Sequence, residues 1–312
     1  MAVVFGAPGP IIGPAPSPRS RIQHKWIGWD GSEWDLTAAG GRSGVVLLND
    51  DVRGLSMPEF DRFTESSAAR HGQRLRGWQV KQRDVLWPVL VYQDDSSEAW
   101  VRYDAAFWHS LHPMSQGTWE VTAPGSETRR LRCTVGSAEQ ALKRDPAFAQ
   151  WAIWAVPMIS DDAFWTGKPE APQFRDAQPV NWLGGGPVGE AGAGGPLVAS
   201  MNATASTASV LNAGDLDGWV RWTVDGPVDA GLELGVGDRL VTIDTAIAEG
   251  SRLVLDTDPE SQQVILDGAE YIPSKVPRFA PIPAGGVTPL VVTMKGAGVV
   301  TATLTPRYFR AW

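Results

Sequence analysis

The stretch WIGWDGSEWDL, residues Trp26–Leu36, indicates the fold class of this chain. Two short Trp-rich segments flank Asp30-Gly31, and an Asp-Gly pair between such segments is typical of a tight β-hairpin. Aromatic and turn residues are frequent in the whole sequence, with 15 Trp beside 34 Gly and 24 Pro. Aromatic side chains favour pleated sheets, and Gly and Pro favour turns, so we expect a mainly β protein.

Three further segments of the first half are expected to be strands. Gly44–Leu48 is a short apolar run, and Thr128–Val135 alternates in a way that places Cys133 inward. Trp151–Ile159, WAIWAVPMI, is apolar on both faces. Such a strand lies either in the centre of a sheet or with its outer face against another chain.

One main helix is expected near residue 100, which makes the first half α+β. Its apolar residues recur at helical spacing: Trp100, Tyr103, Phe107 and Leu111. Asp95 and Glu98 form a capping box, and His112-Pro113 ends the helix. A shorter helix is expected from Ser137 to Asp145-Pro146.

The length of 312 residues predicts two domains. Seven of the thirteen residues of 184–196, GGGPVGEAGAGGP, are Gly, which predicts a flexible linker. We therefore expect domains at 1–183 and 197–312, the first beginning with a Pro-rich extended arm over residues 1–20. The second domain has seven short strand-like segments, as in a β-sandwich: 219–224, 232–236, 239–244, 253–256, 263–267, 290–294 and 299–305.

Charge and cysteine content exclude several classes of function. The net charge is −8, the opposite of what a protein that grips nucleic-acid phosphates needs. The single cysteine, Cys133, forms no internal disulfide and excludes multi-cysteine zinc sites. Neither a signal peptide nor an apolar run of membrane-spanning length is apparent, so we expect no membrane partner.

Two groups of residues have the spacing of a binding site but lack its context. His109 and His112 could share a metal, yet no acidic residue or Cys is near, and cations at a helix C-terminus are the simpler interpretation. Gly184, Gly186 and Gly189 match a dinucleotide-binding fingerprint, but no strand precedes them and no helix follows. We expect these glycines to belong to the linker.

Acidic residues give no better candidates for catalysis. A set resembling a calcium loop, Asp256, Asp258 and Glu260, lacks the glycine and distal Glu of an EF-hand. Asp50-Asp51 and Asp161-Asp162 are expected in turn or cap roles. Nucleophile-elbow, P-loop and zinc-protease motifs are missing from the sequence. We therefore expect no enzyme activity, no cofactor and no metal.

Read in order, these segments resemble the distal tail protein family of long-tailed bacteriophages, in the form called minor tail protein in phages of actinobacteria. The resemblance covers about 290 residues, and its motifs in the first half are Trp26–Leu36, Gly44–Phe60, His71–Val91, Arg129–Val135 and Trp151–Trp165. In the second half they are Asn212-Ala213-Gly214, Trp219–Pro227, Leu240–Thr245 and Pro306-Arg307-Tyr308.

The resemblance implies a β-rich ring-forming (belt) domain followed by a galectin-like β-sandwich. It also implies a structural protein, made in the host cytoplasm, at the distal end of the virion tail. Six copies would form a ring that joins the tail tube to the baseplate hub or tail fibre, and genomic DNA would pass through the channel without specific binding.

The apolar segment 151–159 and the Pro-rich arm would both become more stable by packing against a neighbour. The candidate contacts between subunits are Trp151, Ile153, Trp154, Val156 and Met158. The alternative function is that of a lectin-like carbohydrate-binding protein. It needs aromatic platforms on the second domain, where the only tryptophans are Trp219, Trp222 and Trp312.

Overall fold

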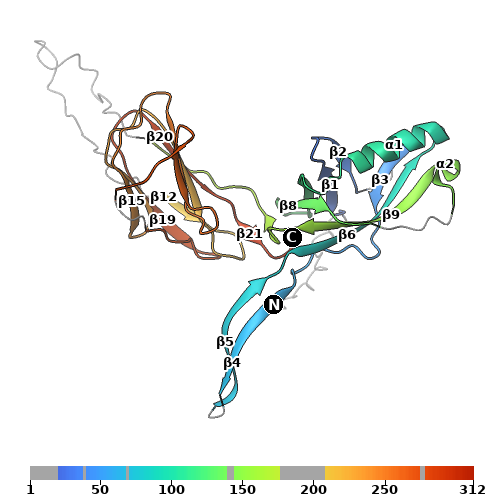
Figure 1. Ribbon diagram of the computed structural model, residues 1–312, viewed down its shortest axis with the longest axis horizontal. Helices are drawn as coiled ribbons and strands as arrows, with labels where there is room; N and C mark the ends of the chain where they lie inside the picture. The colour runs from blue at the N-terminus through green and yellow to red at the C-terminus, as the bar shows by residue number, and fades with distance from the viewer. Residues whose placement is uncertain (1–19, 38–39, 68–69, 139–143, 176–207, 275–277) are drawn as a thin grey trace, which may run out of the picture.

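The chain consists of two β-rich parts and a long hairpin that projects from the first part (Figure 1). A computed structural model describes residues 20–37, 40–67, 70–138, 144–175, 208–274 and 278–312. The predicted linker at 184–196 and nearly all of the predicted arm lie outside these residues. Neither described helix is long and apolar enough to cross a membrane.

The first part is built on an antiparallel sheet of order β2-β1-β7-β8-β9-β6-β3. Its strands are β1 (Gln23–Ile27), β2 (Glu33–Asp35), β3 (Ser43–Leu47), β6 (Arg83–Gln93), β7 (Gly117–Thr122), β8 (Thr128–Val135) and β9 (Trp151–Ser160). The predicted hairpin is confirmed, because β1 and β2 pair Trp26 with Trp34 around the turn. Gly31 has a φ of 79° there, a conformation that favours glycine.

Four tryptophans in mutual contact fill the core of the first part. The ring centroid of Trp87 lies 5.2 Å from that of Trp26 and 5.0 Å from that of Trp119. The ring centroid of Trp165 lies 5.1 Å from that of Trp119. All four side chains are at most 1% exposed. Edge and tilted contacts of this kind add stability beyond simple burial. Cys133 is also buried, which confirms its predicted inward position.

Helix α1 (Ser97–His109) confirms the main predicted helix but corrects both of its ends. The N-cap is Ser96, whose hydroxyl accepts a hydrogen bond from the Ala99 N–H, whereas the Asp95 carboxylate pairs with Arg42. At the other end the helix stops at Ser110, before the predicted His112-Pro113. The N-cap lies one residue later than predicted. Both Asp95 and Ser96 have a side-chain oxygen that can cap a helix, and here the Ser96 hydroxyl does so.

The shorter predicted helix is corrected at its C-terminal end, and most of it lies outside the described residues. Helix α2 (Pro146–Ala149) begins at the Asp145-Pro146 pair that we expected to end a helix. The Asp145 carboxylate accepts hydrogen bonds from the N–H groups of Ala147 and Phe148, and proline suits the first helical turn because it lacks an N–H. Residues 139–143, within the predicted helix, lie outside the described residues.

A long hairpin, β4 (Phe60–Ser67) and β5 (Arg70–Val80), extends away from the first part (Figure 1). The sequence analysis predicted no strands here. Every residue of β4 is exposed, so the alternation of buried and exposed residues that identifies a strand is absent.

The second part is the predicted β-sandwich, with sheets of order β11-β20-β13-β16-β17-β18 and β12-β19-β14-β15. The first sheet contains β11 (Gln173–Arg175), β13 (Val220–Asp225), β16 (Arg252–Asp256), β17 (Gln263–Leu266), β18 (Ala269–Glu270) and β20 (Val299–Leu304). The second contains β12 (Ala208–Leu211), β14 (Leu232–Val236), β15 (Arg239–Ile243) and β19 (Val287–Thr293). Trp222, Leu234 and Leu290 lie between them, each at most 1% exposed. The mainly β fold class is thereby confirmed.

Two segments join the parts in an order that the sequence analysis did not predict. Strand β11 precedes the predicted linker, yet it pairs with β20 of the sandwich. Strand β21 (Arg307–Tyr308), at the C-terminus, returns to pair with β10 (Trp165–Thr166) of the first part. The domain limits at 183 and 197 stay a prediction, since residues 176–207 lie outside the described residues.

Candidate functional site

Strand β9 carries all five predicted contact residues, but the pleat distributes them over two faces. Trp151 and Ile153 point outward, 42% and 51% exposed. Val156 and Met158 point inward and are buried in the core of the same chain. Trp154 is half-buried, and its indole N–H donates to the Asp104 carboxylate at 2.7 Å. Only the outward residues are available to a second chain without refolding.

The outward residues of β9 belong to a larger apolar surface, which we call the outer face. Strand β6 pairs with β9 over its whole length, and residues directly opposite one another share a face of the sheet. The face opposite the core therefore gathers Val46, Leu86, Pro88, Leu90, Tyr92, Trp151, Ile153, Ala155, Pro157 and Ile159. Helix α1 lies on the other face, where the Trp100 indole N–H donates to the Val91 carbonyl.

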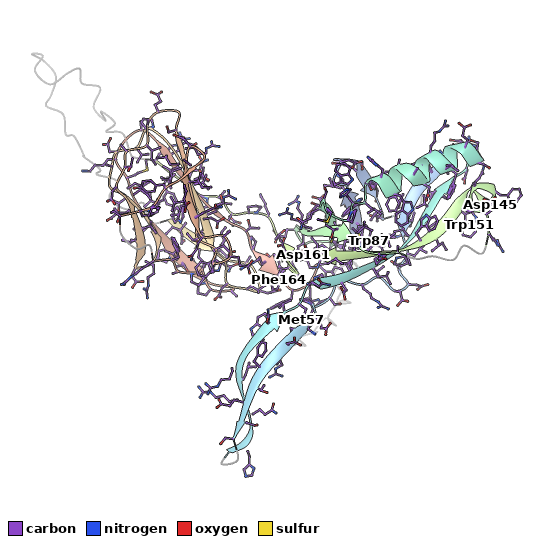
Figure 2. The ribbon with its side chains drawn as sticks, in the orientation of Figure 1. Met57, Trp87, Asp145, Trp151, Asp161 and Phe164 are labelled. Atoms are coloured by element: carbon purple, nitrogen blue, oxygen red, sulfur yellow. The ribbon has the colours of Figure 1, made fainter. Side chains whose placement is uncertain are left out.

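Exposed carboxylates collect at one end of the outer face. Asp84 lies opposite Ile159, and Asp161 and Asp162 follow directly after β9. In Figure 2 Asp161 lies near the base of the hairpin, whereas Trp151 lies at the far end of the first part. The outer face thus has an acidic end and an apolar end.

The hairpin presents the opposite charge. Residues 60–80 contain four arginines and two carboxylates, a net charge of +2 in a chain of −8. Phe63, Leu75 and Trp78 are 53%, 50% and 44% exposed, which is unusual for large apolar side chains. At its base the hairpin is fixed by Lys81, which contacts Glu59 at 2.9 Å and Asp61 at 3.4 Å.

A C-terminal latch, residues 306–312, connects the sandwich to the first part. The Arg83 guanidinium is buried and donates to the carbonyls of Gly54, Ser56, Ala163 and Phe309. Burial lowers the pKa of Arg83 to about 10, which still leaves it charged at neutral pH.

A second set of contacts holds Tyr308 of the latch. The Arg129 guanidinium lies 3.6 Å from the centre of the Tyr308 ring, and the Tyr308 hydroxyl contacts the Glu127 carboxylate at 2.8 Å. Burial and the neighbouring Glu127 raise the pKa of Tyr308 to about 12. The latch is therefore neutral at Tyr308 and held by arginines from two strands.

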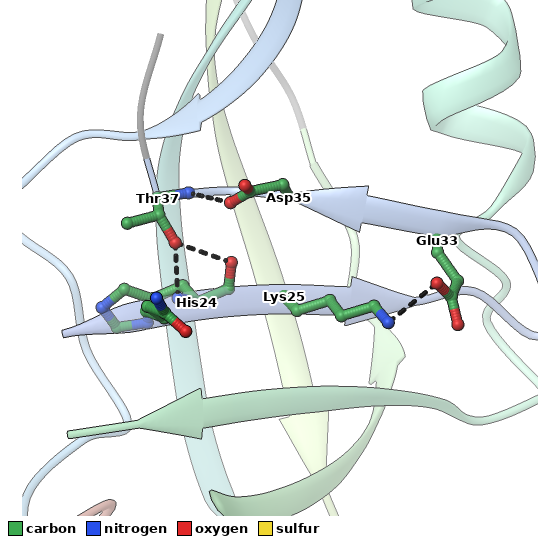
Figure 3. A pocket seen from close by; sticks show the side chains of 6 residues that line it. His24, Lys25, Glu33, Asp35 and Thr37 are labelled. Carbon is green, nitrogen blue, oxygen red and sulfur yellow. Dashed lines mark hydrogen bonds and ion pairs between the residues drawn. The ribbon is translucent and has the colours of Figure 1, made fainter. Parts of the chain in front are cut away.

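A polar hollow lies at the β1–β2 edge and has a volume of about 510 Å³ (Figure 3). Its charged groups are already paired: Lys25 contacts Glu33 at 2.8 Å, and Asp35 accepts from the Thr37 N–H. The hydrogen bond to Glu33 raises the pKa of Lys25, which makes the amine a poorer nucleophile. Burial lowers the pKa of His24, whose ring stacks on Trp119 at 5.8 Å. This arrangement stabilises a sheet edge and has no acid–base couple.

The two histidines of the sequence analysis pack against an aromatic side chain. His109 and His112 both pack against Trp29, with ring centroids at 5.6 and 5.2 Å. His112 Nδ1 accepts from the N–H groups of Met114 and Ser115. Across the described ranges, no group of three or more His, Cys, Asp or Glu side chains is placed to hold a metal ion.

The other candidates occupy turns or lie outside the described residues. Asp256 and Asp258 accept from backbone N–H groups two residues further on, as expected for a polar turn. Gly184, Gly186 and Gly189 lie outside the described residues. Sequence reasoning did not predict the strands of the hairpin, because β4 is exposed at every position, and it did not predict that the C-terminal segment returns to the first part.

Comparison with known proteins finds solved structures of phage proteins that have a similar fold. No protein-family model matches the chain, and no curated protein sequence matches it. The chain is similar to the solved structure of phage SPP1 Dit (gp 19.1), described as a paradigm of the hub adsorption apparatus in phages that infect Gram-positive bacteria. The TM-score is 0.56 at 12% identity, over 92% of this chain and 99% of that one.

A second similar structure is a chain of the phage P2 baseplate in its activated conformation with Ca. Its TM-score is 0.51 at 11% identity, over 91% of this chain and 98% of that one. At such identities the likeness defines the fold. Because it spans both parts, the order of the two β-rich parts is common to all three chains.

Proposed function

We propose that this chain is a structural protein of the phage tail tip, a distal tail protein that joins the tail tube to the baseplate hub or tail fibre. The observation that carries the proposal is the likeness to SPP1 Dit over nearly the full length of both chains. Fold alone does not assign function, so the surfaces must also fit. An outer face with exposed Trp151 and Ile153 and a projecting hairpin suit a protein that assembles.

The proposed assembly is a closed ring of six copies. The number six comes from the family resemblance, whereas the physical argument is that two different surfaces of one chain support head-to-tail contacts, which close into rings. The net charge of −8 suits a channel through which DNA passes, because negative walls repel phosphates. The motifs Trp26–Leu36 and Trp151–Trp165 support the minor tail protein form of actinobacterial phages.

Light scattering combined with electron microscopy of the purified protein, alone and with the tail tube protein, tests the proposal. We expect particles of about 202 kDa, six times the 33.6 kDa chain, with a central channel. A stable dimer or tetramer without a channel, in both preparations, would contradict it.

The alternative function as a lectin loses support from the position of one of its three candidate tryptophans. Trp222 is buried between the two sheets of the sandwich, 1% exposed, and its ring lies 6.4 Å from that of Phe174. A ring in this position cannot stack on a sugar. A glycan array with the full chain is the direct test, and we expect no specific binding.

A further inference from the structure

We propose that the C-terminal latch couples the sandwich to the β4–β5 hairpin, so that the position of the sandwich sets the direction in which the hairpin points. The residue that makes the coupling is Phe309, which contacts the sandwich, the first part and the hairpin at the same time. The coupling acts within one chain and therefore does not depend on the proposed ring.

The sandwich holds the latch through the loop that follows β12. Gly214 lies so close to the latch that an added Cβ atom would stand 2.7 Å from the Arg307 carbonyl oxygen. The Asp215 N–H donates to that carbonyl at 2.8 Å, and the Asp215 carboxylate accepts from the Phe309 N–H at 3.0 Å. The buried side chain of Asn212 fixes the loop through bonds to three backbone groups of the sandwich. The latch must therefore move when the sandwich moves.

The first part also holds the latch, and it does so beside the start of the hairpin. The buried Arg83 guanidinium donates to the Phe309 carbonyl at 2.8 Å. The same guanidinium and the Ala311 N–H donate to carbonyls of the loop 54–56, which leads towards β4. Figure 1 shows β21, within the latch, at the place where the sandwich, the first part and the hairpin meet. The segment that enters the hairpin is thus fixed together with the latch.

The ring of Phe309 supports the base of the hairpin. Its centroid lies 5.7 Å from that of Trp78 in β5 and 6.1 Å from that of Phe164 in the first part. Trp78 in turn contacts Phe60 of β4, with the two centroids 6.2 Å apart. The β4–β5 register places Phe60 and Trp78 on the same face of the hairpin. One row of contacting rings therefore connects the latch to both strands.

The other contacts at the base join the two strands of the hairpin to each other. The Lys81 N–H donates to the Glu59 carbonyl, and the Lys81 ammonium pairs with Glu59 and Asp61. Beyond the base, every residue of β4 is exposed. A two-stranded hairpin of this kind can swing as a unit about its base, because the end residues absorb the change. Its direction then depends on the row of rings and on the loop 54–56.

Phe309 joins three parts of the molecule through three different groups. Its N–H is bound by the sandwich, its carbonyl by Arg83 and its ring by the hairpin. A displacement of the sandwich moves the backbone of Phe309, and with it the ring against which Trp78 packs. Coupling can be transmitted through such a continuous row of contacts when the elements at its ends move as units. A load on the sandwich would therefore redirect the hairpin.

Distances measured by pulsed electron paramagnetic resonance test the coupling. Nitroxide labels at Ala105→Cys on α1 and Arg74→Cys on β5 report the direction of the hairpin. Labels at Ala105→Cys and Glu249→Cys report the position of the sandwich. All three labelled positions are exposed, whereas Cys133 is buried and does not react. An excess of unlabelled chain removes the distances between copies.

Asp215→Ala is the decisive variant, because Asp215 belongs to the sandwich and binds the latch rather than the hairpin. We expect both distance distributions, that of the hairpin included, to become roughly twice as wide as in the unmodified protein. Phe309→Ala should have the same effect on both. Asp215→Asn keeps an oxygen that can accept the Phe309 N–H and should restore both distributions.

The control is Asp229→Ala, which removes an exposed carboxylate from the connection before β14 and should leave both distributions unchanged. A hairpin distribution that stays narrow in Asp215→Ala and Phe309→Ala would overturn the coupling, whether or not the sandwich distribution widens. None of these outcomes bears on the proposed function, which depends on the presence or absence of rings in the unmodified protein.

Discussion

The side chain of Arg83 connects three segments that are far apart in the sequence. Its guanidinium donates to carbonyls of the loop 54–56, of Ala163 and of Phe309, and it is 2% exposed. Replacing it by Met removes the donor to the carbonyls of Ser56, Ala163 and Phe309, whereas the Gly54 carbonyl keeps the Trp165 indole N–H. Each carbonyl left unsatisfied away from water is unfavourable by about 1–3 kcal/mol. We expect Arg83→Met to lower the free energy of unfolding by about 3 kcal/mol or more.

Urea unfolding followed by tryptophan fluorescence measures this loss. Arg53→Met is the matched control, because the Arg53 side chain is exposed and forms a long ion pair of 3.9 Å with Asp51. We expect the control to change stability by less than about 0.5 kcal/mol. Equal effects of the two substitutions would contradict the role of Arg83.

His24 makes stability depend on pH in a defined direction. Burial lowers its pKa below the usual 6.5, so the unfolded chain binds a proton before the folded chain does. The free energy of unfolding should therefore fall as the pH drops below 6.5, by up to about 1.4 kcal/mol per pH unit. His24→Phe keeps an aromatic ring beside Trp119 and removes this titration.

Unfolding measured between pH 5 and pH 7 checks the prediction. The difference in stability between the unmodified protein and His24→Phe should shrink or reverse as the pH falls. His71→Gln, on the projecting hairpin, should retain the pH dependence of the unmodified protein. A difference that stays constant across the range would exclude His24 as its source.

At the scale of elements, the N-terminus of α1 distinguishes two capping residues. Ser96 accepts from the Ala99 N–H at 3.1 Å, whereas Asp95 contacts exposed Arg42. We expect Ser96→Ala to destabilise the protein by about 1 kcal/mol and Asp95→Ala by less than about 0.5 kcal/mol. Thermal unfolding of the two variants decides the matter, and a larger effect of Asp95→Ala would restore the cap that the sequence suggested.

The elements that were predictable from sequence are those that bury one face. Alternation identified β8 and the inward Cys133, and helical spacing identified α1 through Trp100 and Phe107. The β4–β5 hairpin has water on both faces of its sheet, so no period appears in its sequence.

The candidate contact strand shows the same limit. Its sequence is apolar at nearly every position, which is consistent with burial on both faces and cannot tell which residues face the core. Only the pairing with β6 assigns Val156 and Met158 to the chain's own core and Trp151 and Ile153 to the outside. The role of the outward residues in assembly stays a prediction.

At the scale of the whole molecule, the two parts exchange segments. Strand β11 comes from the N-terminal side of the predicted linker and completes a sheet of the sandwich. The latch at the C-terminus pairs with β10, and its Phe309 ring lies 5.7 Å from Trp78 at the base of the hairpin. A force applied to the sandwich would therefore reach the hairpin through the latch, a property that suits the proposed function.

This exchange predicts what happens when the chain is cut between the parts. A specific protease site is placed within residues 184–196 and cleaved. If the parts were independent domains at 1–183 and 197–312, the fragments would separate. We expect them to remain together, because β11 would stay paired with β20 and the latch would stay bound to Arg83 and Arg129.

Size-exclusion chromatography of the cleaved protein, with and without urea, distinguishes these outcomes. The fragments should elute together in native buffer and apart in urea. Adding Tyr308→Ala should weaken the association, since it removes the ring beneath the Arg129 guanidinium and the contact with Glu127. Separation of the unmodified fragments in native buffer would mean that the shared strands contribute little, and the two parts would then be independent domains joined only by the linker.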